Sequence, residues 1–274
     1  MKLLGGREVR DLVTAAGVRP SKHRGQNFLC DPNVVRRIVA LAAVVPGERV
    51  LEVGVGVGSL TAGLAGAGAD VLGVEVDARL AKAAGAVVPD AQIVVSDAAG
   101  LDWREVLGAA PPAKMVSNLP YAVGTSVLVD LLDDVAAMSV FVVMVQREVG
   151  ERLCAGPGDA AYGAVSVKVH YHGTARLEGR VPPSVFWPRP EVDSVLVRID
   201  RHPQPPVDVA PGLLFDVVKA AFGQRRKTVR NALASGWSVE QVDAALAAAG
   251  VDSRARAETL GLDDLAALAT ELGK

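Results

Sequence analysis

The 274-residue sequence contains few cysteines and few aromatic residues. Its two cysteines, Cys30 and Cys154, are far apart and form no Cys-x-x-Cys pair, which argues against a disulfide scaffold or a thiolate metal site. We therefore interpret both as reduced thiols and expect no metal. Only 4% of the residues are Phe, Trp or Tyr, so an aromatic ring beside a polar motif is informative.

Long apolar runs are also absent, although half of the residues are hydrophobic. No stretch reaches the roughly 18 apolar residues of a membrane span, and the opening MKLLGGREVRDLV lacks the apolar centre of a signal peptide. The net charge of −2 argues against indiscriminate binding to polyanions but leaves room for a local basic patch. The composition predicts a soluble cytoplasmic protein.

Short apolar runs alternate with amphipathic stretches through most of the chain. The alternation of strands and helices predicts an α/β fold, a Rossmann-like doubly wound sheet. The expected strands lie within residues 49–56, 70–77, 92–97, 113–120, 139–146, 169–182 and 191–201.

A linker at residues 201–212 carries four prolines and cannot be helical through most of its length. Three amphipathic segments follow it, and the second opens on a capping box of Ser238 and Gln241 and closes on Gly250. We expect a sheet domain over residues 1–204 and a small all-helical domain over residues 205–274.

A glycine loop follows the first strand of the expected sheet, with Gly54, Gly56 and Gly58 in a Gly-x-Gly-x-Gly pattern. Glycine permits positive φ and close approach of a ligand, although a tight strand-to-helix turn alone also needs it. Glu75 ends the next strand, where its carboxylate can accept hydrogen bonds from ribose hydroxyls. Because Ser59 replaces the third glycine of the dinucleotide pattern, we expect an adenosine cofactor without pyrophosphate, S-adenosyl-L-methionine.

Polar residues also end two later strands. Asp97 can accept from an adenine amino group, although alone it is more typical of a turn or helix cap. The quartet Asn118-Leu119-Pro120-Tyr121 suits methyl transfer to an exocyclic amine of an aromatic base. The Asn118 oxygen and Leu119 carbonyl would accept its hydrogen bonds, Pro120 would shape the turn, and Tyr121 would stack on the base. Catalysis would then depend mainly on orientation.

At this point the chain resembles the ribosomal RNA adenine N6,N6-dimethyltransferases of the bacterial 16S type. The resemblance covers residues 19–274 and rests on GQNFLCD, LEVGVGVGSLT, GVEVD, SDA, NLPY, VFWPRPEVDSVLVRI and AFGQRRKTVRNAL. It implies a class I methyltransferase domain followed by a helical RNA-binding domain. The cofactor residues that it implies, together with the glycine loop, are Asn27, Leu29, Gly54, Gly56, Glu75, Asp97 and Asn118. Phe186 would be a second stacking face for the target base, opposite Tyr121.

The sequence departs from the family pattern in two places. Val55 replaces a proline of the glycine loop, and Ala122, Val123, Gly124 and Thr125 follow NLPY in place of Asn-Ile-Ser-Thr. The second departure falls on the wall of the base pocket, where it bears on the rate and on the second methyl transfer.

Two basic clusters are candidate phosphate contacts, although a charge run alone is more typical of a solvated helix face. They comprise Lys22 and Arg24 near the cofactor motif, and Arg225, Arg226, Lys227 and Arg230 in the helical domain.

The resemblance implies transfer of two methyl groups to each of two adjacent adenosines near the 3′ end of 16S rRNA, with a role in ribosome biogenesis. The partner would be the small (30S) ribosomal subunit, and the enzyme would be monomeric. Two alternatives stay open: a 23S rRNA adenine methyltransferase of the macrolide-resistance type, and an assembly factor that chiefly binds RNA. A nicotinamide oxidoreductase is disfavoured because the Gly-x-Gly-x-x-Gly pattern is absent.

Overall fold

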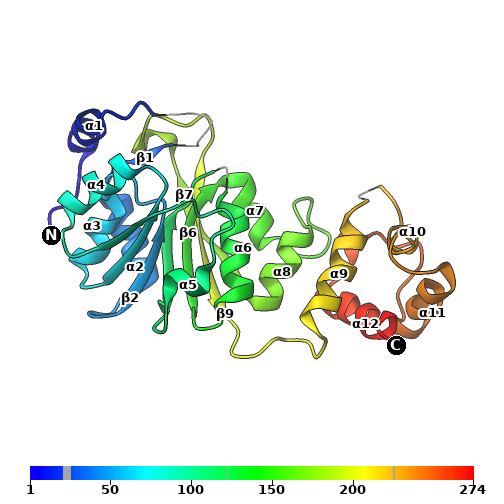
Figure 1. Cartoon of the computed structure of the whole chain (residues 1–274). Coiled ribbons are helices and arrows are strands. Elements are labelled where there is room, and N and C mark those ends of the chain that lie inside the picture. The colour runs from blue at the N-terminus through cyan, green and yellow to red at the C-terminus, as the bar shows by residue number, and fades with distance from the viewer. Residues whose placement is uncertain (21–25, 122, 225) are drawn as a thin grey trace. The chain divides into compact units, whose positions relative to one another are not determined.

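The chain forms two compact units in a computed structural model that describes residues 1–20, 26–121, 123–224 and 226–274 (Figure 1). Residues 1–150 and 176–201 make up the sheet unit, and residues 151–175 and 202–274 make up the helical unit. The sequence places residues 151–175 with the sheet instead. They group with the helices because Tyr162, Val167 and Tyr171 pack in one apolar cluster with the C-terminal helices.

The sheet unit is built on a sheet in the strand order β4-β3-β2-β5-β6-β9-β7. Strands β2 to β6 run parallel, and β9 pairs antiparallel with β6. The bounds are β2 Arg49–Val53, β3 Asp70–Glu75, β4 Gln92–Val95, β5 Lys114–Asn118, β6 Val140–Gln146, β7 Gly173–Val181 and β9 Ser194–Arg201. The expected doubly wound sheet is therefore present.

Helices cover both faces of this sheet. Figure 1 shows α2 and α3 on one side and α6 on the other. Because both faces are covered, the strands read as nearly continuous apolar runs, and Leu51, Val116 and Val142 are fully buried. The bounds are α2 Pro32–Ala42, α3 Ser59–Gly66, α4 Ala78–Val87, α5 Trp103–Leu107, α6 Gly124–Asp134 and α7 Arg147–Cys154.

The order of strands reverses at β2, which has β3 on one side and β5 on the other. The carboxyl ends of these strands meet at one edge of the sheet, and the diverging connections leave a crevice there. This reversal places the glycine loop after β2 beside the residues that end β3, β4 and β5.

A two-stranded ladder lies next to the main sheet. Strand β1 (Phe28–Leu29) pairs antiparallel with β8 (Phe186–Trp187), with Phe28 opposite Trp187. Helix α1 (Gly6–Ala15) precedes β1, and the short helix η1 (Pro183–Val185) precedes β8. The ladder brings the cofactor motif of the N-terminal region against the segment that follows β7.

The helical unit contains the predicted C-terminal helices. The capping box of α11 is confirmed, since Ser238 Oγ accepts from Gln241 N at 3.2 Å and Gln241 Oε1 accepts from Ser238 N at 3.1 Å. Gly250 ends this helix with φ +69°. The bounds are α8 Ala164–His172, α9 Pro211–Phe222, α10 Val229–Leu233, α11 Val239–Ala249, η2 Ala257–Thr259 and α12 Leu262–Leu272.

The run at residues 169–182 differs from its predicted structure. The sequence predicts one strand, but helix α8 continues to His172 and β7 begins only at Gly173. Val169 and Tyr171 are buried, and His170 and His172 are half-buried. This alternation imitates a strand because α8 is covered on several sides and therefore lacks a single apolar stripe.

The two cysteines form no disulfide with each other, as their separation in the sequence predicts. Cys30 and Cys154 are both free thiols. Met138 and Met144 are fully buried in the sheet unit. Within the described part of the chain, the helices include none with the length and apolarity needed to cross a bilayer.

Candidate cofactor and base-binding site

The glycine loop turns the chain from β2 into α3. Gly54, Gly56 and Gly58 have φ values of +80°, +59° and +86°, which L side chains rarely adopt. A Cβ on Gly54 would lie 2.9 Å from Pro120 Cγ, so the loop closes directly onto the Asn-Leu-Pro-Tyr segment. Glycine at this position therefore meets two requirements, a left-handed backbone and contact with the end of β5.

Replacing Gly54 by alanine is expected to destabilise the fold by about 1–3 kcal/mol through the backbone conformation alone. It is also expected to displace Pro120 and weaken cofactor binding. Gly47→Ala is the matched control, because Gly47 has φ +82° but no atom within 4 Å of an added Cβ. Calorimetric titration of both variants with S-adenosylhomocysteine separates the effect of backbone strain, which they share, from the effect of contact with Pro120. Equal affinity in the two variants would contradict a role for close packing at Gly54.

The Glu75 carboxylate is held in place at the end of β3. Its Oε2 accepts from Gly56 N at 2.8 Å, and its Oε1 accepts from Asp77 N at 3.0 Å. The residue is 6% exposed, and this burial raises the pKa of its carboxyl above the usual value. Since each carboxylate oxygen has two acceptor positions, both oxygens retain capacity for ribose hydroxyls.

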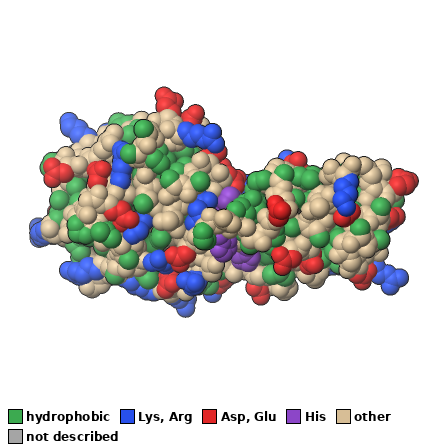
Figure 2. All heavy atoms as spheres, turned by 90° about the horizontal axis from the view of Figure 1, so that it is seen from below, with side chains coloured by type: hydrophobic (Ala, Val, Ile, Leu, Met, Phe, Trp, Pro, Cys, Tyr) green, Lys and Arg blue, Asp and Glu red, His purple; other side chains and the backbone are tan. Residues whose placement is uncertain are grey.

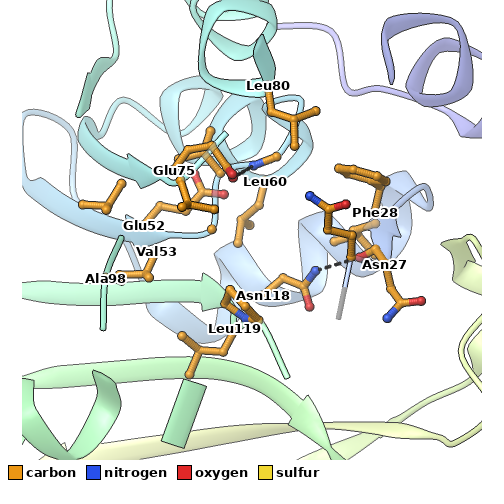
Figure 3. A pocket seen from close by; sticks show the side chains of 18 of the residues that line it. Asn27, Phe28, Glu52, Val53, Leu60, Glu75, Leu80, Ala98, Asn118 and Leu119 are labelled. Carbon is orange, nitrogen blue, oxygen red and sulfur yellow. Dashed lines mark hydrogen bonds between the residues drawn. The ribbon is translucent and has the colours of Figure 1, made fainter. Parts of the chain in front are cut away.

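These elements surround one cavity of about 480 Å³ at the carboxyl edge of the sheet (Figure 3). Its polar lining comes from successive strand ends and from the segment that leads into β1. Every predicted cofactor residue lines it: Asn27, Leu29, Gly54, Gly56, Glu75, Asp97 and Asn118. Leu119, Pro120 and Tyr121 line it too. The structure thus brings together residues separated by up to 94 positions in the sequence.

Asn118 links the end of β5 to the N-terminal cofactor motif. Its Nδ2 donates to the Asn27 carbonyl at 3.3 Å, and Figure 3 shows this bond across the cavity. The bond fixes the amide with its nitrogen on Asn27, so that Oδ1 remains the acceptor. The following residue is held as well, because Leu119 N donates to Met144 O at 3.1 Å.

One departure from the family pattern, Gly124, lies at the start of α6. A Cβ on Gly124 would lie 2.8 Å from Leu119 Cβ, so a larger residue there would press on the Asn-Leu-Pro-Tyr segment. Leu119 is 2% exposed and has little space to move. Ala122, the other position that lacks the polar side chain of the family pattern, lies outside the described residues.

Tyr121 is half-buried at the cavity and is anchored through its hydroxyl. The Tyr121 hydroxyl lies 3.1 Å from Ser194 Oγ in β9, and Ser194 is fully buried. Burial raises the pKa of this phenol, so it stays neutral. This anchor gives the ring a defined orientation at the cavity wall.

Phe186 is not brought to the cavity with Tyr121. Its side chain is 5% exposed and packs in the apolar core of the sheet unit with Leu29 and Val35. It is absent from the described residues that line the cavity. A stacking role for Phe186 would therefore require its ring to leave this core, which the sequence motif alone does not reveal.

The predicted phosphate contacts divide into three groups. Lys22, Arg24 and Arg225 lie outside the described residues. Arg226 and Lys227 are exposed in the turn before α10. Arg230 instead pairs with Asp243 on α11, with Nη2 2.7 Å from Oδ2.

The Arg230 pair lowers the pKa of the Asp243 carboxyl, because the guanidinium hydrogen bonds to its ionised form. The charge of Arg230 is thus matched within the helical unit, which weakens its candidacy as a phosphate contact.

Glu52 is a cavity residue that the sequence reasoning missed. It is 1% exposed in β2, and its Oε2 accepts from Thr61 Oγ1 at 2.7 Å. Burial raises the pKa of Glu52 to about 8, the Thr61 bond opposes this shift, and the charge of nearby Glu75 adds to it. The available signal was an acid between the apolar residues Leu51 and Val53 of β2.

Ser59 is a second missed residue. It lines the cavity at the first position of α3 and is 6% exposed. Its buried Oγ has no hydrogen-bond partner within the described residues.

Comparison with known proteins extends the likeness well beyond the cavity. Residues 19–274 match the sequence profile described as ribosomal RNA adenine dimethylase. The chain belongs to this family. This chain is therefore an rRNA adenine dimethyltransferase. The family and the enzyme class expected from the sequence are both confirmed.

Relatives of this dimethylase include two proteins named ribosomal RNA small subunit methyltransferase A. The protein of Leifsonia xyli subsp. xyli is 46% identical over 98% of each chain. The protein of Thermobifida fusca is also 46% identical, over 98% of this chain and 96% of its own.

Solved structures confirm the class I methyltransferase fold. The 23S rRNA methyltransferase ErmE matches the dimethylase with a TM-score of 0.65 and 26% identity, over 90% of this chain and 100% of its own. A dimethyladenosine transferase from Plasmodium falciparum matches with a TM-score of 0.74 and 20% identity, over 88% and 95% of the respective chains. The second likeness shows the fold alone.

Proposed function

We propose that this dimethylase transfers methyl groups from S-adenosyl-L-methionine to N6 of adenosines in small-subunit rRNA. The products would be two adjacent N6,N6-dimethyladenosines near the 3′ end of 16S rRNA. The observation that carries the proposal is that Asn118 and Leu119 line the same cavity as Glu75 and Asp97. The 46% identity to proteins named for the small subunit favours this RNA over 23S rRNA.

The lining of the cavity fits the proposed cofactor. The Glu75 carboxylate suits ribose hydroxyls, and Asp97 can accept from the adenine amino group while its Oδ1 caps Ala99 N at 2.9 Å. The buried Ser59 hydroxyl offers a further donor at the cavity wall. Asn27, Leu29, Gly54, Gly56 and Asn118 would complete the site. When bound, the cofactor supplies an activated methyl group on its sulfonium.

The protein groups at the end of β5 would orient the target amine. An adenine N6 is a poor nucleophile because its lone pair is delocalised into the ring. Asn118 Oδ1 and the Leu119 carbonyl would accept hydrogen bonds from its two N–H groups. These bonds would favour a pyramidal nitrogen with its lone pair directed at the methyl group. Tyr121, anchored on Ser194, would stack on a base that has left its own stack.

The target RNA in this proposal is part of the small (30S) ribosomal subunit, and the enzyme acts in the cytoplasm as a monomer during ribosome biogenesis. On the face shown in Figure 2, acidic and basic side chains are interspersed over the sheet unit. With a net charge of −2, specific contacts rather than the overall charge would guide RNA binding. Arg226 and Lys227 are candidate contacts in the described residues.

Replacing Arg226 or Lys227 by alanine is expected to reduce by about one the slope of log affinity against log salt concentration. Each change removes one exposed cation from the proposed RNA contact. Arg230→Ala serves as the comparison, because Asp243 already matches its charge. Filter binding of small subunits over a salt series measures the slope. An equal reduction of the slope in the Arg230 variant would contradict the distinction between Arg230 and the two exposed cations.

The proposal is tested with labelled S-adenosyl-L-methionine and small subunits that lack the modification. Large-subunit RNA and duplex DNA are assayed in parallel, and nucleosides are identified by mass. Dimethyladenosine in small-subunit RNA alone is expected. Label in large-subunit RNA would support the macrolide-resistance type instead. Binding of cofactor and subunits without transfer would support an assembly factor.

A further inference from the structure

Helix α1 packs behind the cofactor cavity and precedes the region that matches the family profile. The family profile begins at residue 19, after α1 ends at Ala15. None of the α1 residues is among the described residues that line the cavity. Its buried face, formed by Val9 and Val13, is nevertheless fully inaccessible to solvent.

The apolar face of α1 packs against residues that line the cavity from the other side. Val9 and Val13 form one cluster with Phe28, Val57 and Leu80. These last three residues line the cavity and are at most 7% exposed. Each therefore has one side toward the cavity and another in a cluster with α1.

Phe28 carries this contact to the glycine loop. A Cβ on Gly56 would lie 3.2 Å from Phe28 Cδ1, so the ring lies directly against the loop. The Phe28 ring also stacks on Trp187 of β8, with centroids 6.5 Å apart. Displacement of α1 would leave the ring supported mainly from the β8 side.

A polar chain of contacts connects the end of α1 with Glu75. Arg79 Nη1 donates to the Gly17 carbonyl at 3.1 Å. The same guanidinium holds Asp77, with Nη2 2.7 Å from Oδ2 and Nε 3.0 Å from Oδ1. Asp77 N then donates to Glu75 Oε1 at 3.0 Å. Two residues, Arg79 and Asp77, thus link the segment after α1 to the carboxylate proposed to bind ribose.

We propose that α1 is a positioning element for the cofactor, with Val9 and Val13 as its positioning residues. This inference rests on the proposed cofactor function of the cavity. Docked α1 holds Phe28 and Leu80 in place from behind and supports Glu75 through Arg79. When α1 undocks, the cavity walls sample arrangements that do not bind the cofactor. The apparent dissociation constant then rises as the fraction of binding-competent protein falls.

The test compares two substitutions one position apart in the full-length chain. Val13→Asp places a charge on the buried face, whereas Thr14→Asp places the same charge on the exposed face. Titration with S-adenosylhomocysteine is expected to show about a tenfold weaker affinity for Val13→Asp and less than a twofold change for Thr14→Asp. At saturating S-adenosyl-L-methionine, kcat for methylation of small subunits stays near the wild-type value, so the change appears in KM.

A milder variant keeps the test decisive if Val13→Asp fails to fold. Val9→Ala combined with Val13→Ala retains an apolar face but loosens its packing, and is expected to weaken binding severalfold. A lower thermal midpoint with unchanged affinity would show that α1 only stabilises the fold, and would overturn the inference. Failure of the wild-type protein to bind S-adenosylhomocysteine would instead overturn the proposed function on which this inference depends.

Discussion

Replacing Asn118 by alanine is expected to reduce methyl transfer to small-subunit rRNA by about 100- to 1,000-fold, the range typical for loss of one preorganised hydrogen-bonding group. Asn118 Oδ1 is the side-chain acceptor proposed for the target amine, and its Nδ2 is already held by Asn27 O at 3.3 Å. Alanine removes both the acceptor and the bond that orients it. Single-turnover transfer with saturating cofactor measures the effect on the chemical step.

The control for Asn118→Ala is Asn33→Ala. Asn33 is an exposed residue of α2 whose Oδ1 accepts from Arg36 Nη1 at 2.8 Å, away from the cavity lining. Its loss is expected to leave transfer unchanged within a factor of about two. Retention of near wild-type transfer by Asn118→Ala would contradict the proposed mechanism. If that variant also supported normal subunit binding and growth, the assembly-factor alternative would gain support.

Replacing Glu52 by glutamine is expected to remove a large part of the pH dependence of stability. In the unfolded chain this carboxyl ionises near its ordinary pKa of 4.5, whereas burial raises the folded-state pKa to about 8. Between these values the unfolded state binds fewer protons than the folded state. The free energy of unfolding of the wild type therefore falls as pH rises through this window, by up to about 1.4 kcal/mol per pH unit.

Glutamine retains an oxygen acceptor for the Thr61 hydroxyl but cannot ionise. Urea unfolding at several values between about pH 5 and pH 8 is expected to give a shallower slope for Glu52→Gln than for the wild type. Glu240→Gln, at an exposed position on α11, is expected to leave the slope unchanged. A wild-type slope that persists in Glu52→Gln would show that other groups cause the pH dependence.

The lining of the cavity was predictable because it depends on strand ends. Gly54, Glu75, Asp97 and Asn118 each follow an apolar run, and the carboxyl ends of parallel strands meet at one edge of a sheet. The approximate position of each strand was sufficient to bring these residues together. Errors of one or two residues in a strand boundary do not move them to another edge.

The burial of Phe186 and the unit to which residues 151–175 belong were not predictable, because both depend on contacts that leave little pattern in the sequence. Phe186 belongs to the two-residue strand β8, and its burial follows from pairing with Leu29, not from a periodic pattern. The segment 151–175 joins the helical unit through Tyr162 and Tyr171, which pack against helices far along the chain. Glu52 was missed for a related reason, because its burial and its contact with Thr61 appear only after β2 and α3 are packed together.

The most direct measurement is a crystal structure of the full-length protein with S-adenosylhomocysteine. It is expected to place the ribose hydroxyls on Glu75, the adenine amino group on Asp97, and the sulfur toward Asn118 in the cavity at the end of the parallel strands. Binding elsewhere, or in the cavity with the adenine toward Asn118, would contradict the account.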